Sequence, residues 1–213
     1  MVEEVLGRFL CRLYPLVCSK TDLEKKNYVA EGHRFEDETS EQLYYLALEL
    51  GLEPNPPRMT LYMPSVSGNH HQFDASFTHG RTVYVIECKN TKVAAKDYIY
   101  YFNAKIIDYS LASRRDSDGI TFRGIFLSTV PLVESAWLYA LSYGIRVIDP
   151  ESPPIEYMVE TLGDNEALVS ALKILLDRVN MVSPFKDSMS LEDTSRLLGE
   201  YRFLCTRWRD FQE

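Results

Sequence analysis

Three residues of the chain combine residue types and a spacing that could support chemistry: Asp74, Glu87 and Lys89. Glu87 and Lys89 are two residues apart at the end of an apolar segment, so on a β-strand their side chains point to the same face. A hairpin turn at His79-Gly80 would bring Asp74 within about one or two positions of Glu87. Two carboxylates can hold a hard cation such as Mg²⁺, and an amine beside them can orient or activate a water molecule. The spacing predicts that these groups converge at one edge of a sheet.

These residues also have a purely structural interpretation. A Glu-x-Lys at the end of a buried strand often only marks the point where the strand reaches solvent. The acid on the preceding strand and the long helix that follows favour a site instead. The neighbouring pair His70 and His71 could suggest zinc, but adjacent strand residues point to opposite faces, so we interpret them as polar strand residues.

The elements that must position the three residues are predicted in the order helix, three strands, helix, strand, helix, strand. The first helix begins at about Thr39 or Ser40, which would cap it, and ends at Leu50 before Gly51. The strands are predicted at 58–63, 71–78, 82–88, 122–127 and 145–148, and the later helices at 94–112 and 131–143. Pro131 would stand in the first turn of the last of these helices.

This order predicts the fold class. Strands joined by a short turn pair in antiparallel fashion, whereas strands separated by helices pair in parallel. We therefore expect an α/β fold whose core is a mixed sheet flanked by helices.

Further helices are predicted at both ends of the chain. Apolar residues recur at helical spacing in 2–18, residues 19–34 are typical of a loop or a weak helix, and residues 155–213 contain two amphipathic helices. Prolines at 150, 153 and 154 mark a boundary. We divide the chain into a helical N-terminal extension (1–34), a core (35–150) and a helical C-terminal appendage (151–213).

The charge of the chain is uneven. The formal net charge of the 213 residues is -8, which argues against a protein covered by basic surface. Residues 81–124 nevertheless hold eight lysines and arginines against five acids, whereas residues 151–195 hold three against nine. Positive charge gathers in the middle of the chain, where a polyanion could bind.

The sequence predicts neither a membrane span nor a secretory signal. Uninterrupted apolar stretches fall short of the ~18 residues that a spanning helix needs. The N-terminal Met-Val-Glu-Glu does not lead from a basic region into an apolar run. We expect a cytoplasmic location.

The run Phe73-Asp74-Ala75 followed by Val83-Tyr84-Val85-Ile86-Glu87-Cys88-Lys89-Asn90 resembles the signature of the PD-(D/E)xK nuclease superfamily. The predicted helix and strand that follow are in the expected order. The segment from Ser135-Ala136-Trp137 to Tyr143-Gly144-Ile145 resembles the last helix and strand of Mrr-like restriction endonucleases. The resemblance covers roughly residues 35–150 and implies a restriction endonuclease-like core of order αβββαβαβ.

The resemblance implies an activity and a role for each residue. The chain would be a Mg²⁺- or Mn²⁺-dependent endonuclease that hydrolyses DNA phosphodiester bonds, of a restriction, repair or mobile-element type. Asp74, Glu87 and the backbone carbonyl of Cys88 would bind the metal ion. Lys89 would orient or activate the attacking water and offset charge in the transition state.

The chain departs from the family pattern at two points. Phe73 stands where many relatives have proline. The family also places an acid on the first helix that joins the catalytic and metal-binding residues, and Glu41 fits that position best, with Glu36 and Glu38 as alternatives. An acidic start of a helix explains all three equally well.

The expected partners are DNA and a second copy of the chain, without a membrane or a small-molecule cofactor. The apolar stripes of residues 155–213 need a surface to cover them. They could pack back onto the core, or they could pair with the same helices of a second chain in a homodimer, which we favour. The alternative function is that of a catalytically inactive nuclease fold that binds nucleic acid or protein.

Overall fold

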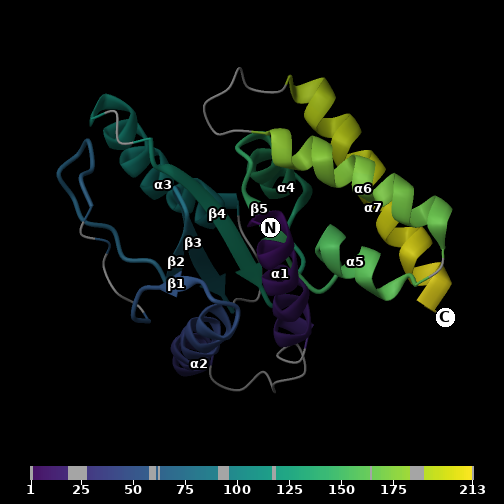
Figure 1. Cartoon of the computed structure of the whole chain (residues 1–213), viewed down its shortest axis with the longest axis horizontal. Coiled ribbons are helices and arrows are strands. Elements are labelled where there is room, and N and C mark those ends of the chain that lie inside the picture. Colours follow the sequence, from purple (N-terminus) through teal and green to yellow (C-terminus); the bar gives the residue numbers. More distant parts are fainter. Residues whose placement is uncertain are drawn as a thin grey trace.

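The computed structural model describes residues 2–18, 28–57, 61, 63–90, 96–116, 119–163, 165–182 and 190–212, with the backbone alone at 2–3 and 28–35. Within these residues, twelve elements form one α/β unit around a five-stranded sheet (Figure 1). No described helix is both long and apolar enough to cross a membrane.

The sheet is mixed, as expected from the sequence. Its strands lie in chain order: β1 (Glu53–Pro54), β2 (Ala75–His79), β3 (Thr82–Lys89), β4 (Thr121–Ser128) and β5 (Arg146–Ile148). The first three strands pair in antiparallel fashion, and β3, β4 and β5 pair in parallel. The predicted hairpin and the predicted parallel pairs are therefore confirmed.

Seven described helices accompany the sheet: α1 (Val2–Cys18), α2 (Tyr28–Glu49), α3 (Lys96–Asp116), α4 (Glu134–Ser142), α5 (Ile155–Thr161), α6 (Glu166–Met181) and α7 (Leu191–Gln212). From α2 to β5 the order is that predicted for the core. Helix α2 runs without a break across the boundary expected between residues 34 and 35.

The alternation of side chains along β3 divides the interior into two layers. Val83 and Val85 face the cluster that includes α3 and α4, whereas Tyr84 and Ile86 face the cluster that includes α1 and α2. Both faces of β3 are covered because nearly every position is apolar, as a central strand requires. The sheet thus forms the middle of three layers (Figure 1).

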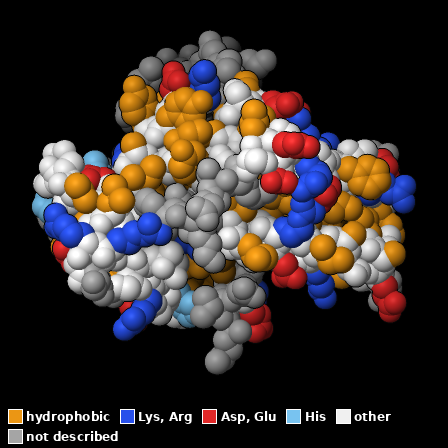
Figure 2. Space-filling model, turned by 90° about the horizontal axis from the view of Figure 1, so that it is seen from above, with side chains coloured by type: hydrophobic (Ala, Val, Ile, Leu, Met, Phe, Trp, Pro, Cys, Tyr) orange, Lys and Arg blue, Asp and Glu red, His pale blue; other side chains and the backbone are white. Residues whose placement is uncertain are grey.

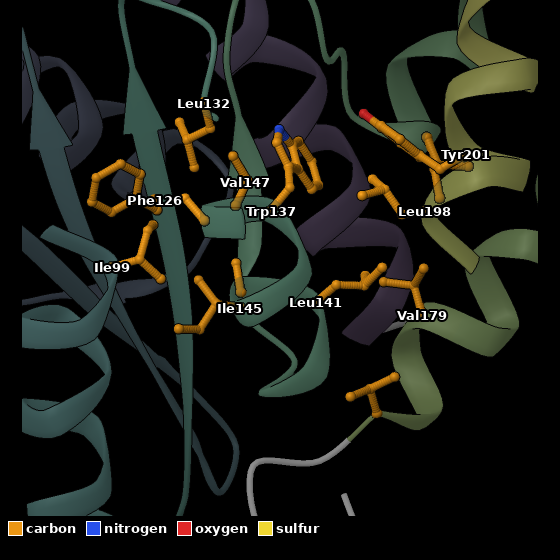
Figure 3. Close-up of a cluster of buried hydrophobic side chains, with 14 of the residues drawn as sticks. Ile99, Phe126, Leu132, Trp137, Leu141, Ile145, Val147, Val179, Leu198 and Tyr201 are labelled. Carbon is orange, nitrogen blue, oxygen red and sulfur yellow. The ribbon is translucent and has the colours of Figure 1, made fainter. Parts of the chain in front are cut away.

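The two amphipathic helices at the C-terminus pack back onto the core. Val179 of α6 and Leu198 and Tyr201 of α7 lie in the same buried cluster as Trp137 of α4 (Figure 3). The rings of Trp137 and Tyr201 are 5.3 Å apart between centroids. The apolar stripes that suggested a homodimer are therefore covered within the chain itself.

The start of α2 was predicted wrongly. Thr39 and Ser40 lie inside the helix, not at its N-cap, and both are buried. The Ser40 hydroxyl donates to the carbonyl oxygen of Glu36 at 2.6 Å, a bond by which serine is accommodated within a helix. The predicted end is confirmed: Gly51 follows with a φ of 72°, a conformation that glycine adopts without strain.

Three further predictions need correction. The strand expected at 58–63 falls mostly outside the described residues, and residues 61 and 63 are not in a strand, so β1 is the observed edge strand. Pro131 precedes α4 by three residues and does not stand in its first turn. The strand expected at 71–78 begins only at Ala75, which leaves Asp74 just before it.

Candidate active site

Asp74 lies directly across the hairpin from the end of β3. Its backbone N–H donates to the carbonyl oxygen of Ile86 at 3.1 Å, and its Oδ2 accepts from the backbone N–H of Cys88 at 2.7 Å. The residue is only 8% exposed. The observed pairing of Ala75 with Ile86 puts Asp74 opposite Glu87, within the offset expected from the turn.

Lys89 lies between two carboxylates. Its Nζ is 3.1 Å from Glu87 Oε1 and 3.0 Å from Glu36 Oε1. The side chains of Lys89 and Glu87 share one face of β3, as their spacing predicted, and they are 17% and 13% exposed. The structure thus brings Asp74, Glu87 and Lys89 together at one edge of the sheet.

On α2, Glu36 contacts Lys89, whereas the favoured candidate Glu41 does not lie beside the three residues. The Glu36 carboxylate accepts a hydrogen bond from the Lys89 ammonium, whereas Glu41 is exposed on another side of the same helix. The two residues are five positions apart, so they cannot share one helix face. Glu41 had been favoured because α2 was expected to begin at Thr39 or Ser40, which placed the whole segment before it outside the helix.

Lys105 of α3 joins the site and was missed by sequence reasoning. Its Nζ is 3.1 Å from Glu87 Oε2 and 3.1 Å from the carbonyl oxygen of Gln72. Lys105 directly precedes Ile106, so the buried stripe of α3 could have placed it at the border of the packed face. The buried stripe of α3 alone does not predict that Lys105 contacts Glu87 of β3.

A glycine on β4 lets α3 approach the sheet closely enough for this contact. A Cβ at Gly124 would lie 2.6 Å from Ile106 Cδ1 and 2.9 Å from Phe102 Cε1. Phe102 and Ile106 flank Lys105 on the helix, so the absence of a side chain at Gly124 helps to set the height of Lys105 above β3.

The charges of the site act strongly on each other. Burial and the neighbouring carboxylate of Glu87 raise the pKa of Asp74 to about 6, although the Lys89 ammonium and the Cys88 N–H oppose the shift. For Lys89, burial lowers the pKa, but the carboxylates of Glu87, Asp74 and Glu36 outweigh it and raise the pKa above its usual value. Without a bound cation, Lys89 is therefore an ammonium at neutral pH.

The donor set of the site suits a hard divalent cation. Among the described contacts, the carboxylates of Asp74, Glu87 and Glu36 lie near the ammonium groups of Lys89 and Lys105. Burial and the Glu87 carboxylate raise the pKa of Asp74, and a bound cation would favour its charged form. Carboxylate oxygens are the ligands that Mg²⁺ prefers, and one or two are sufficient. Among the described residues, no three Asp, Glu, His or Cys side chains already form a metal-binding group.

The resemblance implies a metal-binding role for the backbone carbonyl of Cys88. The N–H of this residue points to Asp74, and the N–H and C=O of one strand residue point to the same side. We therefore expect the Cys88 carbonyl to face the Asp74 side of β3. The Cys88 thiol lies in the opposite layer and is fully buried.

A second buried carboxylate, Asp149, follows β5 and is not exposed at all. It accepts hydrogen bonds from the backbone N–H groups of Leu132 and Glu151 at 3.1 and 2.9 Å and from the indole N–H of Trp137 at 3.2 Å. These donors are uncharged, and they join the start of α4 to the end of β5. Asp149 is therefore held as a structural group.

His71 also has a structural partner. Its Nε2 lies 2.7 Å from Asp108 Oδ2 of α3, and the same carboxylate accepts from the backbone N–H of Ser67 at 2.8 Å. The contact ties the segment before Asp74 to α3.

No protein-family model and no curated protein matches the chain. Among solved structures, the small subunit of the heterodimeric restriction endonuclease R.BspD6I is similar, with 12% identity and a TM-score of 0.47 over 91% of this chain and 97% of that chain. The protein of unknown function AF1548 is similar with 16% identity and a TM-score of 0.42, over 80% of this chain and 98% of that one.

The restriction endonuclease MspJI, solved in complex with a 27-mer oligonucleotide, is similar over 77% of this chain and 35% of its own length. The identity is 16% and the TM-score is 0.32. These similarities concern the course of the chain, and the chemistry of the site follows from its own residues.

Proposed function

We propose that the chain is a metal-dependent endonuclease that hydrolyses DNA phosphodiester bonds. The observation that carries the proposal is the position of Lys89, whose ammonium contacts Glu87 and Glu36 beside the buried carboxylate of Asp74. These residues follow the PD-(D/E)xK signature in the order of its motif. If Lys89 only ended the strand in solvent, its side chain would be exposed. Instead it is about four-fifths buried and lies between two carboxylates.

Asp74 and Glu87, with the backbone carbonyl of Cys88, would hold Mg²⁺ or Mn²⁺. When bound, the ion supplies positive charge to the phosphoryl oxygens and to the departing oxygen. The hydrogen bond from the Cys88 N–H engages one oxygen of Asp74, Oδ2, and so helps to hold this carboxylate in place.

Lys89 would act on the attacking water and on the phosphate. Held between Glu87 and Glu36, its ammonium is positioned to donate hydrogen bonds to oxygens that gain negative charge. Glu36 would be a positioning residue, because it holds the Lys89 ammonium in place and does not itself contact the substrate.

DNA is the proposed substrate because the segment 35–150 resembles Mrr-like restriction endonucleases. The excess of basic residues in 81–124 includes both lysines of the site and supports a polyanionic partner. Elsewhere charge is mixed: on the face seen in Figure 2, acidic and basic side chains of the described residues are interspersed with hydrophobic ones.

Cleavage of supercoiled plasmid in the presence of Mn²⁺ tests the proposal. The wild-type protein is expected to nick or linearise the plasmid, and Lys89→Ala is expected to lose this activity. Lys173→Ala is the matched control, because Lys173 is exposed on α6. Equal cleavage by the wild type and Lys89→Ala would assign the nuclease activity to another site or to a contaminant.

An inactive nuclease fold that binds nucleic acid or protein is the second candidate. It is favoured by the two lysines that already pair with both oxygens of Glu87. Calorimetric titration with Mn²⁺ separates the two functions. Binding that disappears in Asp74→Asn supports the enzyme, and absence of binding even with DNA present supports the inactive module.

We also propose that two chains associate through α6 and α7. The stripes of these helices are covered, but their outer sides expose Ile174, Met181, Phe203 and Phe211 by half or more. A contiguous patch of exposed apolar side chains is typical of an interface, and the proposal requires that these four residues form one. Light scattering is expected to show a dimer that Phe203→Asp converts to a monomer, and a monomeric wild type would refute the association.

A further inference from the structure

Glu87 has each carboxylate oxygen paired with a different ammonium group. Lys89 contacts Oε1 and Lys105 contacts Oε2, both at 3.1 Å. The nuclease signature accounts for Lys89 but not for Lys105, which comes from a separate helix. A cation that binds Glu87 has to compete with one of these two groups.

The two lysines are not held equally. Lys89 has a second carboxylate partner in Glu36 and is 17% exposed. Lys105 is 27% exposed, and its other contacts are the neutral carbonyl of Gln72 and the face of the Phe73 ring, 5.4 Å from its centroid. An ammonium group bound to two carboxylates is held more strongly than one bound to a single carboxylate. We therefore expect a cation that binds Glu87 to displace Lys105 and not Lys89.

The geometry points to a double role for Lys105: it occupies Glu87 Oε2 until a divalent cation binds, and its released ammonium then binds a phosphate of the DNA beside the site. This inference rests on the proposed nuclease function. The lysine side chain is long and flexible and is 27% exposed, so its head group can turn without movement of α3. The site thereby keeps its positive charge near the DNA when the cation arrives.

The role predicts effects of opposite sign that a simple structural ion pair would not produce. Removal of the Lys105 charge frees Glu87 and should strengthen cation binding, while it removes a phosphate contact and should weaken DNA binding. A lysine that only stabilises the fold would weaken both, together with the thermal stability.

Calorimetric titration of the full chain with Mn²⁺ measures the first effect. Lys105→Met is expected to bind Mn²⁺ about tenfold more tightly than the wild type, and Lys105→Arg, which keeps the charge, about as the wild type does. Lys96→Met is the matched control, because Lys96 is exposed on the same helix. Lys105→Gln gives the same comparison if the methionine variant does not fold.

Binding of a short DNA duplex at several salt concentrations measures the second effect. In a Lys89→Ala background, which prevents cleavage, and with Mn²⁺ at one fixed saturating concentration, Lys105→Met should reduce the slope of log affinity against log salt by about 0.9, the value of one phosphate contact. An unchanged slope, or Mn²⁺ binding that is unchanged or weaker in the folded variant, overturns the inference.

The outcome is distinguishable from failure of the proposed function. Wild-type protein that binds Mn²⁺ and cuts DNA, with Lys105→Met unchanged in both titrations, removes the role of Lys105 and leaves the nuclease in place. Wild-type protein that neither binds Mn²⁺ nor cuts DNA overturns both.

Discussion

Asp74 and Asp149 are both buried carboxylates at the same edge of the sheet, but their partners differ. Asp149 follows β5 and accepts three hydrogen bonds from uncharged N–H donors. Asp74 lies beside the end of β3 and accepts one such bond, while the charged groups of Glu87, Lys89 and Glu36 surround it. The carboxylate of Asp149 is therefore held by hydrogen-bond donors. The carboxylate of Asp74 instead lies near two other carboxylates, Glu87 and Glu36, and one ammonium group, Lys89.

The pKa values of both groups rise for the same first reason, which is burial. For Asp149 the next causes are hydrogen bonds, which lower the pKa, whereas for Asp74 the next cause is Glu87, which raises it further. Burial of an acid therefore does not identify a functional site by itself. Carboxylates that are crowded together in a cleft are more typical of a functional site, because a ligand of opposite charge can offset their repulsion.

The largest expected difference between the two acids is in activity. Asp74→Asn keeps the shape of the side chain but removes a metal-binding charge, and plasmid cleavage should fall by about 10²-fold or more. Thermal unfolding should show that the variant is folded. Cleavage within a few-fold of the wild type would remove Asp74 from the site and place it with Asp149 as a structural acid.

Asp149→Ala should have the opposite profile. Three N–H groups, two of them buried, would lose their acceptor, which should lower the free energy of unfolding by about 3 kcal/mol. Denaturant titration measures this change, with Asp177→Ala as a control because Asp177 is exposed on α6. Cleavage per folded molecule should stay near that of the wild type, and a large loss would mean that Asp149 also serves the site.

The pH dependence of stability should separate the acids further. The folded-state pKa of Asp74, about 6, is above its unfolded value of 3.8, so the folded chain binds this proton more tightly. Stability from this group is present below about pH 4 and is lost as pH rises to about pH 6, by roughly 2 kcal/mol. Asp74→Asn should lack this loss and be more stable than the wild type at neutral pH. Parallel stability profiles of the two proteins would contradict the raised pKa.

The smallest of these effects concerns the acid of α2. Glu36→Gln keeps a hydrogen-bond acceptor for Lys89 but removes a charge, so cleavage should fall about tenfold, as for partners that orient a reacting group. Glu41→Gln, on the exposed side of the same helix, should cleave as the wild type does. A larger effect at Glu41 would show that α2 turns differently against the sheet when DNA is bound.

The chain order and the β2–β3 hairpin could be predicted from the sequence because both depend on local interactions. A two-residue turn closes a short loop, and the alternation of apolar residues fixes the register, since a slip by one residue would turn Val83 and Val85 to the other face. The meeting of Asp74 with Glu87 and Lys89 follows from that register. Local pattern also located α6 and α7, but not whether their stripes would meet the core or a second chain.

Glu36 and Lys105 needed the tertiary structure because each lies on a helix whose rotation is set by distant contacts. The height and rotation of α3 depend on Gly124, a residue of another strand that leaves room for Phe102 and Ile106. Helix α2 begins eleven residues before the predicted cap. Thr39 and Ser40 are buried within it, and the Ser40 hydroxyl bonds to the backbone of the preceding turn. Capping preference is a local signal, and the burial that overrode it comes from packing against the rest of the chain.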